Sequence, residues 1–181
     1  ALPISDALLD YQYWSPTDPQ KRPYDDTGWT FPEAFAVQAV RVVDAKVLDA
    51  PMARVSGLVT APAGTVGTGA LFAIHHNADN ALITLRYRLK EADMQLAEEP
   101  FEAAGQQFGR GSFVIKGVAQ ADLDRAVSAL GLKAYAIEKA PDVKMHPARA
   151  ARVAMLHSWS NTQAEGWWRQ AFDIYEIPYD Y

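Results

Sequence analysis

Apolar residues in the second half of the chain change regularly between short continuous runs and stripes at helical spacing. Runs at residues 71–74, 94–97, 113–115 and 134–137 predict buried strands, and the stripes between them predict helices. The second of these helices is expected to stop at Gly131. The stripes consist of Ala78, Ala81, Leu82, Leu85 and Leu89 in the first helix and of Leu123, Ala126, Val127 and Leu130 in the second.

Strands that alternate with helices of about ten to fifteen residues are typical of a parallel sheet with helices on both faces. The sequence therefore predicts an α/β fold with a mostly parallel open sheet, in a flavodoxin-like or Rossmann-like arrangement. Residues 63–140 would form the main α/β unit, and residues 141–150 would form a polar connection to the C-terminal segment.

Residues 151–181 predict the start of a further βα unit. A strand at residues 153–156 leads into a polar turn and then a helix, where Thr162 and Glu165 fit a capping box. The next strand would begin at residues 177–179, so we expect the missing strands of this sheet to lie in sequence beyond this chain. The helix is expected to bury one stripe, formed by Ala164, Trp168, Ala171, Phe172 and Tyr175.

Residues 1–62 differ in composition from the rest and predict an N-terminal arm with accessory strands. Residues 37–43 alternate as a strand does, and residues 53–60 are a second candidate. The glycine-rich residues 64–69 predict a flexible entry loop, since they precede a strand rather than a helix, unlike a phosphate loop. The arm mixes Pro3, Pro16, Pro19 and Pro23 with Tyr11, Tyr13, Trp14, Tyr24 and Trp29, which favours an extended, packed segment.

Composition excludes several classes of protein. The 181 residues are about half apolar, which is enough for one sizeable core or two small ones. A net charge of −5 without a basic cluster argues against nucleic-acid binding, and no apolar run is long enough for a membrane span, so we expect a soluble protein. The absence of cysteine excludes disulfides, thiolate zinc sites and a cysteine nucleophile within this sequence.

Two polar turns follow predicted strands at their carboxyl ends. In an open parallel sheet these ends and the starts of the next helices face one crevice, where ligands bind. The turns therefore form either the rim of a site for a small ligand or peptide end, or well-capped connections in which Asn77 caps a helix and His76 rests at the crevice edge. The candidate ligand-binding residues are His75, His76, Asn77, Asn80, His157, Ser158 and Asn161.

We predict no catalytic or metal-binding set in this chain. Adjacent His75 and His76 on a strand point to opposite faces, and no histidine has a glutamate three residues later, as a zinc carboxypeptidase site requires. Ser158 lacks the Gly-x-Ser-x-Gly elbow of a hydrolase nucleophile. A weaker alternative is a hydrolase that pairs Glu165 or Asp79 with a histidine.

Several segments together resemble the region that follows the catalytic domain in large bacterial zinc carboxypeptidase-like proteins of the carboxypeptidase A family. The matching segments are residues 23–32, 47–52, 76–80 with 86–90, 159–168 and 177–179.

This resemblance implies a region with the fold of class I glutamine amidotransferases, placed after a zinc-containing peptidase domain. Without a cysteine it would be a non-catalytic relative, so zinc and proteolysis would belong to the peptidase domain, with no cofactor in this chain. Such parent proteins are typically exported, which implies a periplasmic or secreted location. We therefore expect an accessory domain that packs on or modulates the peptidase domain, with the aromatic residues between 11 and 31 as the contact.

Overall fold

In the computed structural model the chain divides into two compact units, residues 1–57 and 58–181. The proline- and aromatic-rich arm predicted for residues 1–30 lies outside the described residues, apart from Thr17. The structure describes residues 17, 31–35, 37–57, 59, 61–77, 79–160 and 162–181.

The described part of the first unit holds two short helices, α2 (Phe31–Ala34) and η1 (Ala45–Asp49). Asp44 caps η1, because its carboxylate accepts a hydrogen bond of 3.0 Å from the Lys46 amide. The strands predicted at residues 37–43 and 53–60 are wrong for the described residues, which are irregular and exposed. Alternation alone does not make a strand, since a strand also needs a neighbour with which to pair.

The second unit is built on a six-stranded sheet with the order β1-β7-β2-β6-β3-β8. Only β1 and β7 run parallel, and the other four neighbouring pairs are antiparallel. The strands are β1 (Gly64–Val66), β2 (Leu71–Ile74), β3 (Asp93–Ala97), β6 (Phe113–Lys116), β7 (Lys133–Ala136) and β8 (Met145–Pro147).

The prediction of a mostly parallel, flavodoxin-like or Rossmann-like sheet is therefore wrong. The helices α3 (Ala81–Arg88) and α4 (Gln120–Ala129) do link β2 to β3 and β6 to β7, as the periodicity indicated. Each βαβ unit, however, is split by a strand of the other unit, which gives the βαββαβ order of ferredoxin-like domains. Hydrophobic periodicity reports which segments are strands and helices, but not which strands become hydrogen-bonded neighbours.

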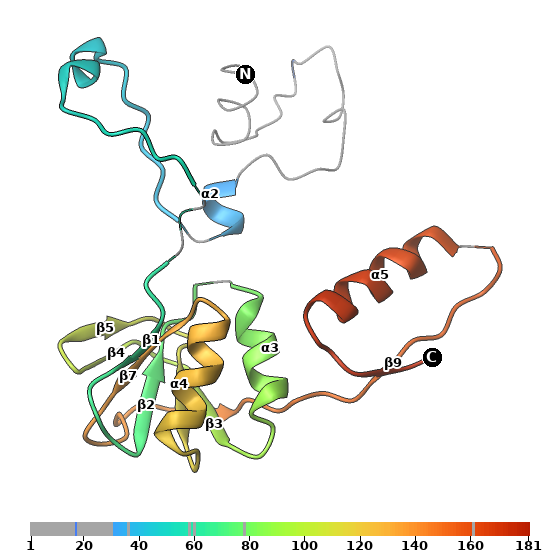
Figure 1. The fold of residues 1–181 in the computed structure, drawn as a ribbon. Helices are drawn as coiled ribbons and strands as arrows, with labels where there is room; N and C mark the ends of the chain where they lie inside the picture. Colours follow the sequence, from blue (N-terminus) through green and yellow to red (C-terminus); the bar gives the residue numbers. More distant parts are fainter. Residues whose placement is uncertain are drawn as a thin grey trace. The chain divides into compact units, whose positions relative to one another are not determined.

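Among the described residues of the second unit, α3 and α4 cover the same face of this sheet, which corrects the expectation of helices on both faces. Figure 1 shows α3 and α4 side by side over the sheet, and the main core lies beneath them around Phe72 and Ile115, both 0% exposed. The opposite face is covered by a hairpin of β4 (Phe101–Ala103) and β5 (Gln106–Phe108), which was not predicted.

The hairpin joins β4 and β5 through a two-residue turn of Ala104 and Gly105. Both residues have positive φ, 49° and 67°, as a type I′ turn requires. Alanine in this region of backbone conformation is strained, whereas asparagine tolerates it.

We therefore expect Ala104→Asn to raise the free energy of unfolding by about 0.5 to 1 kcal/mol. The matched variant Ala104→Val should lower it, because a β-branched side chain is disfavoured at positive φ. Urea unfolding of both variants checks this prediction, and the same sign of change in both would contradict it.

The predicted loop at residues 64–69 is a strand followed by a fixed connection, which corrects the expectation of a flexible entry loop. Residues Gly64–Val66 form β1, and the Thr65 amide donates a 2.8 Å hydrogen bond to the Asp124 carboxylate on α4. The Gln120 side chain then holds the connection, accepting from the Gly69 amide at 3.2 Å and donating to the Gly67 carbonyl at 2.9 Å.

Residues 151–181 belong to the second unit and contain the predicted strand, helix and strand. The strands β9 (Val153–Ala154) and β10 (Tyr179–Asp180) pair in parallel, and α5 (Thr162–Ile174) connects them. The predicted buried stripe is wrong in one respect, because no described residue of α5 is buried. Ala164 and Trp168 are exposed, whereas Ala171, Phe172 and Tyr175 are half-buried.

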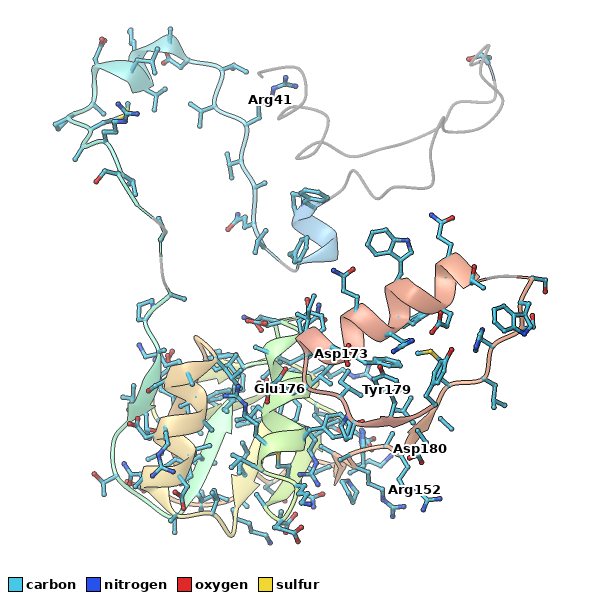
Figure 2. The ribbon with its side chains drawn as sticks, turned by 45° about the vertical axis from the view of Figure 1, so that its right-hand side comes forward. Arg41, Arg152, Asp173, Glu176, Tyr179 and Asp180 are labelled. Atoms are coloured by element: carbon cyan, nitrogen blue, oxygen red, sulfur yellow. The ribbon has the colours of Figure 1, made fainter. Side chains whose placement is uncertain are left out.

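The end of α5 is attached to α3. The buried hydroxyl of Thr84 donates a hydrogen bond to the Tyr175 carbonyl at 2.9 Å. The side-chain amide of Asn80 donates a second one to the Tyr175 hydroxyl at 3.1 Å. Arg88 makes a two-point ion pair with Glu176, at 2.8 and 2.5 Å, which lowers the pKa of the Glu176 carboxyl. Figure 2 shows Glu176 at the end of α5 that lies next to α3.

Candidate functional site

The first predicted turn, after β2, sends its two histidines to different surroundings. His75 lies on the hairpin side of the sheet, stacked on Phe108 at 4.3 Å between ring centres and edge-on to Tyr135 at 5.7 Å. Burial lowers the pKa of His75 from its ordinary value of 6.5. His76 is exposed, and its ring lies against Gly111 on the other side. The opposite orientation expected for neighbouring strand residues thus separates the pair.

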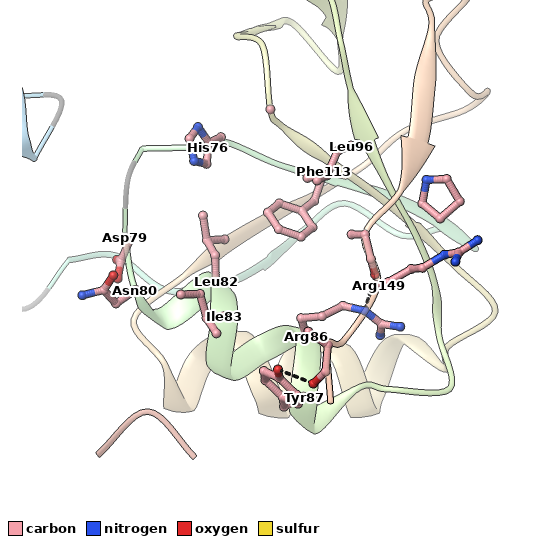
Figure 3. A pocket seen from close by; sticks show the side chains of 14 residues that line it. His76, Asp79, Asn80, Leu82, Ile83, Arg86, Tyr87, Leu96, Phe113 and Arg149 are labelled. Carbon is pink, nitrogen blue, oxygen red and sulfur yellow. Dashed lines mark hydrogen bonds between the residues drawn. The ribbon is translucent and has the colours of Figure 1, made fainter. Parts of the chain in front are cut away.

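His76 and Asn80 lie at the edge of a pocket beside α3, which has a volume of about 480 Å³. Figure 3 shows this α3 pocket, with Leu82, Leu96 and Phe113 forming its apolar floor. The volume lies within the range of about 300 to 1,000 Å³ that is usual for ligand sites. Asn77, which was expected at the same rim, is exposed but does not line the pocket.

The wall opposite α3 is residues 147–151, and two α3 side chains hold it in place. The guanidinium of Arg86 donates to the Ala148 carbonyl and also to the Leu89 and Lys90 carbonyls, at 2.8 and 3.1 Å. The Tyr87 hydroxyl donates to the Ala151 carbonyl at 2.8 Å, drawn as a dashed line in Figure 3. The pocket therefore has fixed walls on both sides.

The second predicted turn lies beside the start of α5. His157 Nε2 is 2.5 Å from the Tyr181 hydroxyl, and the two rings stack at 5.2 Å between centres. Desolvation and the nearby Glu165 carboxylate raise the pKa of Tyr181. Ser158 makes its hydrogen bond with Ser160, at 2.8 Å between hydroxyl oxygens. Asn161, the last candidate of this turn, lies outside the described residues.

The two turns do not form one crevice around the α3 pocket. Asn80 contacts Tyr175, just after the last residue of α5, whereas His157 and Ser158 precede its first residue. His157 instead stacks on Tyr181, whose ring centre lies 4.7 Å from the Arg169 guanidinium in the middle of α5. His157 and Ser158 are not among the residues that line the α3 pocket. Ligand binding by any of these residues stays a prediction.

Asp79 and Glu165, the carboxylates that a hydrolase site would pair with a histidine, have other partners in the structure. Asp79 accepts a 2.8 Å hydrogen bond from the Ala81 amide at the start of α3, and Glu165 pairs with Arg169 at 3.2 Å. A histidine and a carboxylate do meet elsewhere, at the sheet edge, where His146 Nδ1 is 3.1 Å from Glu98. Lys144 and then His146 lower the pKa of the half-buried Glu98 carboxyl, and the three residues form an ion cluster at the sheet edge.

Sequence reasoning missed Arg149, which lines the α3 pocket. It lies in the segment predicted to be a polar connection, where a single arginine carries no signal of its own. Its significance depends on Ala148 and Ala151, whose backbone groups are anchored on α3.

Within the residues that the structure describes, no group of three or more His, Cys, Asp or Glu side chains could hold a metal ion. None of the helices described is long and apolar enough to cross a membrane. No protein-family model, curated protein or solved structure matches this chain.

Proposed function

We propose that this chain is a non-catalytic accessory domain that binds another protein domain through α5. The observation that supports this most strongly is the exposure of large apolar side chains on and beside α5, a helix in which no described residue is fully buried. Trp167 and Ile174 are 65% and 64% exposed, and Trp159 is 92% exposed. Trp167 and Ile174 are seven residues apart and therefore share one face of α5, which we name the α5 surface.

Such a surface fits a protein interface better than open solvent. Exposed apolar patches of this kind mark interaction sites, and tryptophan is among the residues that contribute most to binding energy. A helix of 13 residues is also only marginally stable without packing partners. A second domain on the α5 surface would supply that packing.

The proposed partner is the peptidase domain of a zinc carboxypeptidase-like parent protein. The support for this partner is the resemblance of residues 23–32, 47–52, 76–80 with 86–90, 159–168 and 177–179 to the region that follows the catalytic domain in such proteins. Zinc and proteolysis would belong to the peptidase domain, in a periplasmic or secreted protein. The aromatic arm between residues 11 and 31 remains a second proposed contact, and it lies outside the described residues except at Thr17 and Phe31.

Binding measurements with a matched pair of variants test this proposal. The peptidase domain encoded in the same reading frame is titrated with this chain by calorimetry. Ile174→Ser is expected to raise the Kd about tenfold or more, and Trp167→Ala about thirtyfold. Val66→Ser, which replaces a 44% exposed side chain on β1, should leave the Kd unchanged.

Three outcomes would contradict the proposal. One is a reading frame without a peptidase domain, and another is the absence of any binding. The third is an equal effect of Val66→Ser and Ile174→Ser, which would show that α5 is not the contact.

The α3 pocket supports a second candidate function, the binding of a small ligand or peptide end. A preformed cavity of about 480 Å³ with an apolar floor is the observation that favours it. His76 and Asn80 would contribute from the predicted set, whereas His157 and Ser158 lie elsewhere. This function and the accessory role are compatible, because the pocket and the α5 surface use different residues.

A further inference from the structure

We infer that the α3 pocket binds a small monocarboxylate with an apolar body, and that Arg149 receives the carboxylate. This inference rests on the second candidate function, the binding of a small ligand in that pocket. It adds the chemical class of the ligand and the residue that recognises it.

The apolar body would contact the floor of the pocket. Leu82 is 4% exposed and Phe113 is 8% exposed, whereas Ile83, which also lines the pocket, is 43% exposed. A ligand that covers the exposed isoleucine and fills the apolar part of the pocket gains about 25 cal/mol for each Å² of apolar surface that is removed from water. An apolar group on the ligand would gain this energy, and a highly charged ligand would not.

Arg149 lines the pocket, and its guanidinium forms no ion pair and no hydrogen bond with the described part of the chain. Arg86 also lines the pocket, but its guanidinium already donates to three backbone carbonyls. Asp79 caps the start of α3 through the Ala81 amide. The charge that remains available to a ligand is therefore the positive charge of Arg149.

The backbone on both sides of Arg149 is fixed before any ligand arrives. The Ala148 amide donates to the Met94 carbonyl at 2.8 Å, and the Ala148 carbonyl accepts from Arg86. Two residues beyond Arg149, the Ala151 carbonyl accepts from Tyr87. Figure 3 shows Arg149 on this anchored segment, with its side chain directed away from Leu82, Ile83 and Phe113, so the guanidinium must rotate toward the apolar floor to meet a bound carboxylate. An anchored backbone lowers the entropy that a binding residue loses when its ligand arrives.

A single free guanidinium suits a monocarboxylate better than a phosphate dianion. Guanidinium and carboxylate match in a planar, two-point hydrogen-bonded pair. A dianion would leave one charge uncompensated, and it would lie in the same pocket as the Asp79 carboxylate. A free small acid and the carboxyl terminus of a peptide share the favoured chemistry.

The experiment compares ligands that differ only in charge. The chain is titrated with N-acetylphenylalanine and with its neutral amide, each to about 10 mM, a concentration that detects millimolar Kd values. Amide NMR shifts at Ile83 and Gly111 report binding at the pocket. We expect the acid to bind about tenfold or more tightly than the amide, because a charge-assisted pair is lost in the amide. Parallel titrations with 3-phenylpropionate and with acetyl-Gly-Gly-Phe distinguish a free acid from a peptide end.

Two arginine variants separate the role of Arg149 from general charge. Arg149→Gln should abolish the preference for the acid while the amide binds as before. Arg152→Gln removes a positive charge three residues away, outside the pocket lining, and should keep the preference. Ile83→Asn should weaken the binding of the acid and of the amide to the same extent.

The outcomes distinguish this inference from the function on which it rests. Equal binding of acid and amide, or a preference that survives Arg149→Gln, overturns the assignment of Arg149 and leaves the pocket as a binding site. Failure of every probe to shift the pocket resonances overturns the ligand-binding function as well.

Discussion

Replacing Phe72 with alanine is expected to lower the free energy of unfolding of residues 58–181 by about 3 to 5 kcal/mol. Phe72 is 0% exposed on β2, opposite Ile115 on β6 and Ala136 on β7. Its side chain belongs to the core that both helices cover, so the deletion leaves a cavity between the sheet and the helical layer. Urea unfolding followed by circular dichroism measures the loss.

Phe35→Ala is the matched control, since it deletes the same atoms from a side chain that is 56% exposed in the first unit. It should leave the unfolding of residues 58–181 unchanged. A loss below about 1 kcal/mol for Phe72→Ala would contradict the position of this core.

Replacing Phe108 with alanine is expected to cost about 3 to 5 kcal/mol and also to change the titration of His75. Phe108 is 1% exposed and stacks on Phe101 at 4.9 Å and on His75 at 4.3 Å between ring centres. Without this ring, water reaches the imidazole, so the pKa of His75 should rise back toward 6.5. NMR titration of the histidine ring measures the shift.

The lowered pKa of His75 also predicts a pH dependence of stability. In the folded state its pKa lies below the ordinary value of 6.5, which applies when the chain is unfolded. At a pH between these two pKa values, the His75 ring binds more protons in the unfolded chain than in the folded one. The contribution of His75 to the free energy of unfolding is therefore fully present above pH 6.5 and is lost as the pH falls through the lower, folded-state pKa.

In Phe108→Ala this part of the pH dependence should shrink, because the two pKa values approach each other. Phe172→Ala, at a half-buried position on α5, should leave the His75 titration unchanged. An unaltered pKa of His75 in Phe108→Ala would show that the stacking does not cause the shift.

The elements of the main core could be predicted because their burial is periodic. The strands β2, β3, β6 and β7 and the helices α3 and α4 were all expected near their observed positions. Their sheet could not be predicted in the same way, since strand order depends on long-range pairing that leaves no local pattern. The βαβ connections are compatible with both a parallel sheet and the split antiparallel one.

The missed elements had weak local signals. The β4–β5 hairpin turns at Ala104 and Gly105 rather than at an Asn-Gly pair, which is the strongest short hairpin signal. The strands β1 and β8 have three residues each, too few for alternation to show. Trp168 and Phe172 did recur at helical spacing, but a spacing says nothing about whether a packing surface is present in the same chain.

The candidate site could be predicted only in part. His76 and Asn80 follow from their place after a strand and before a helix, and both line the α3 pocket. Neighbouring His75 turned to the hairpin side, because successive strand residues face opposite ways. Arg149 could not be predicted, since its place depends on hydrogen bonds between α3 and residues 148–151, more than 60 positions apart in the sequence.

The central claim, that α5 is a docking element, is tested most directly by amide hydrogen exchange of residues 163–174. Exchange is measured for the chain alone and after addition of the peptidase domain encoded in the same reading frame. The account predicts rapid exchange along α5 in the free chain and slower exchange in the mixture, with amides of β2 and β6 unchanged. Exchange along α5 that stays the same when the peptidase domain is present would contradict it.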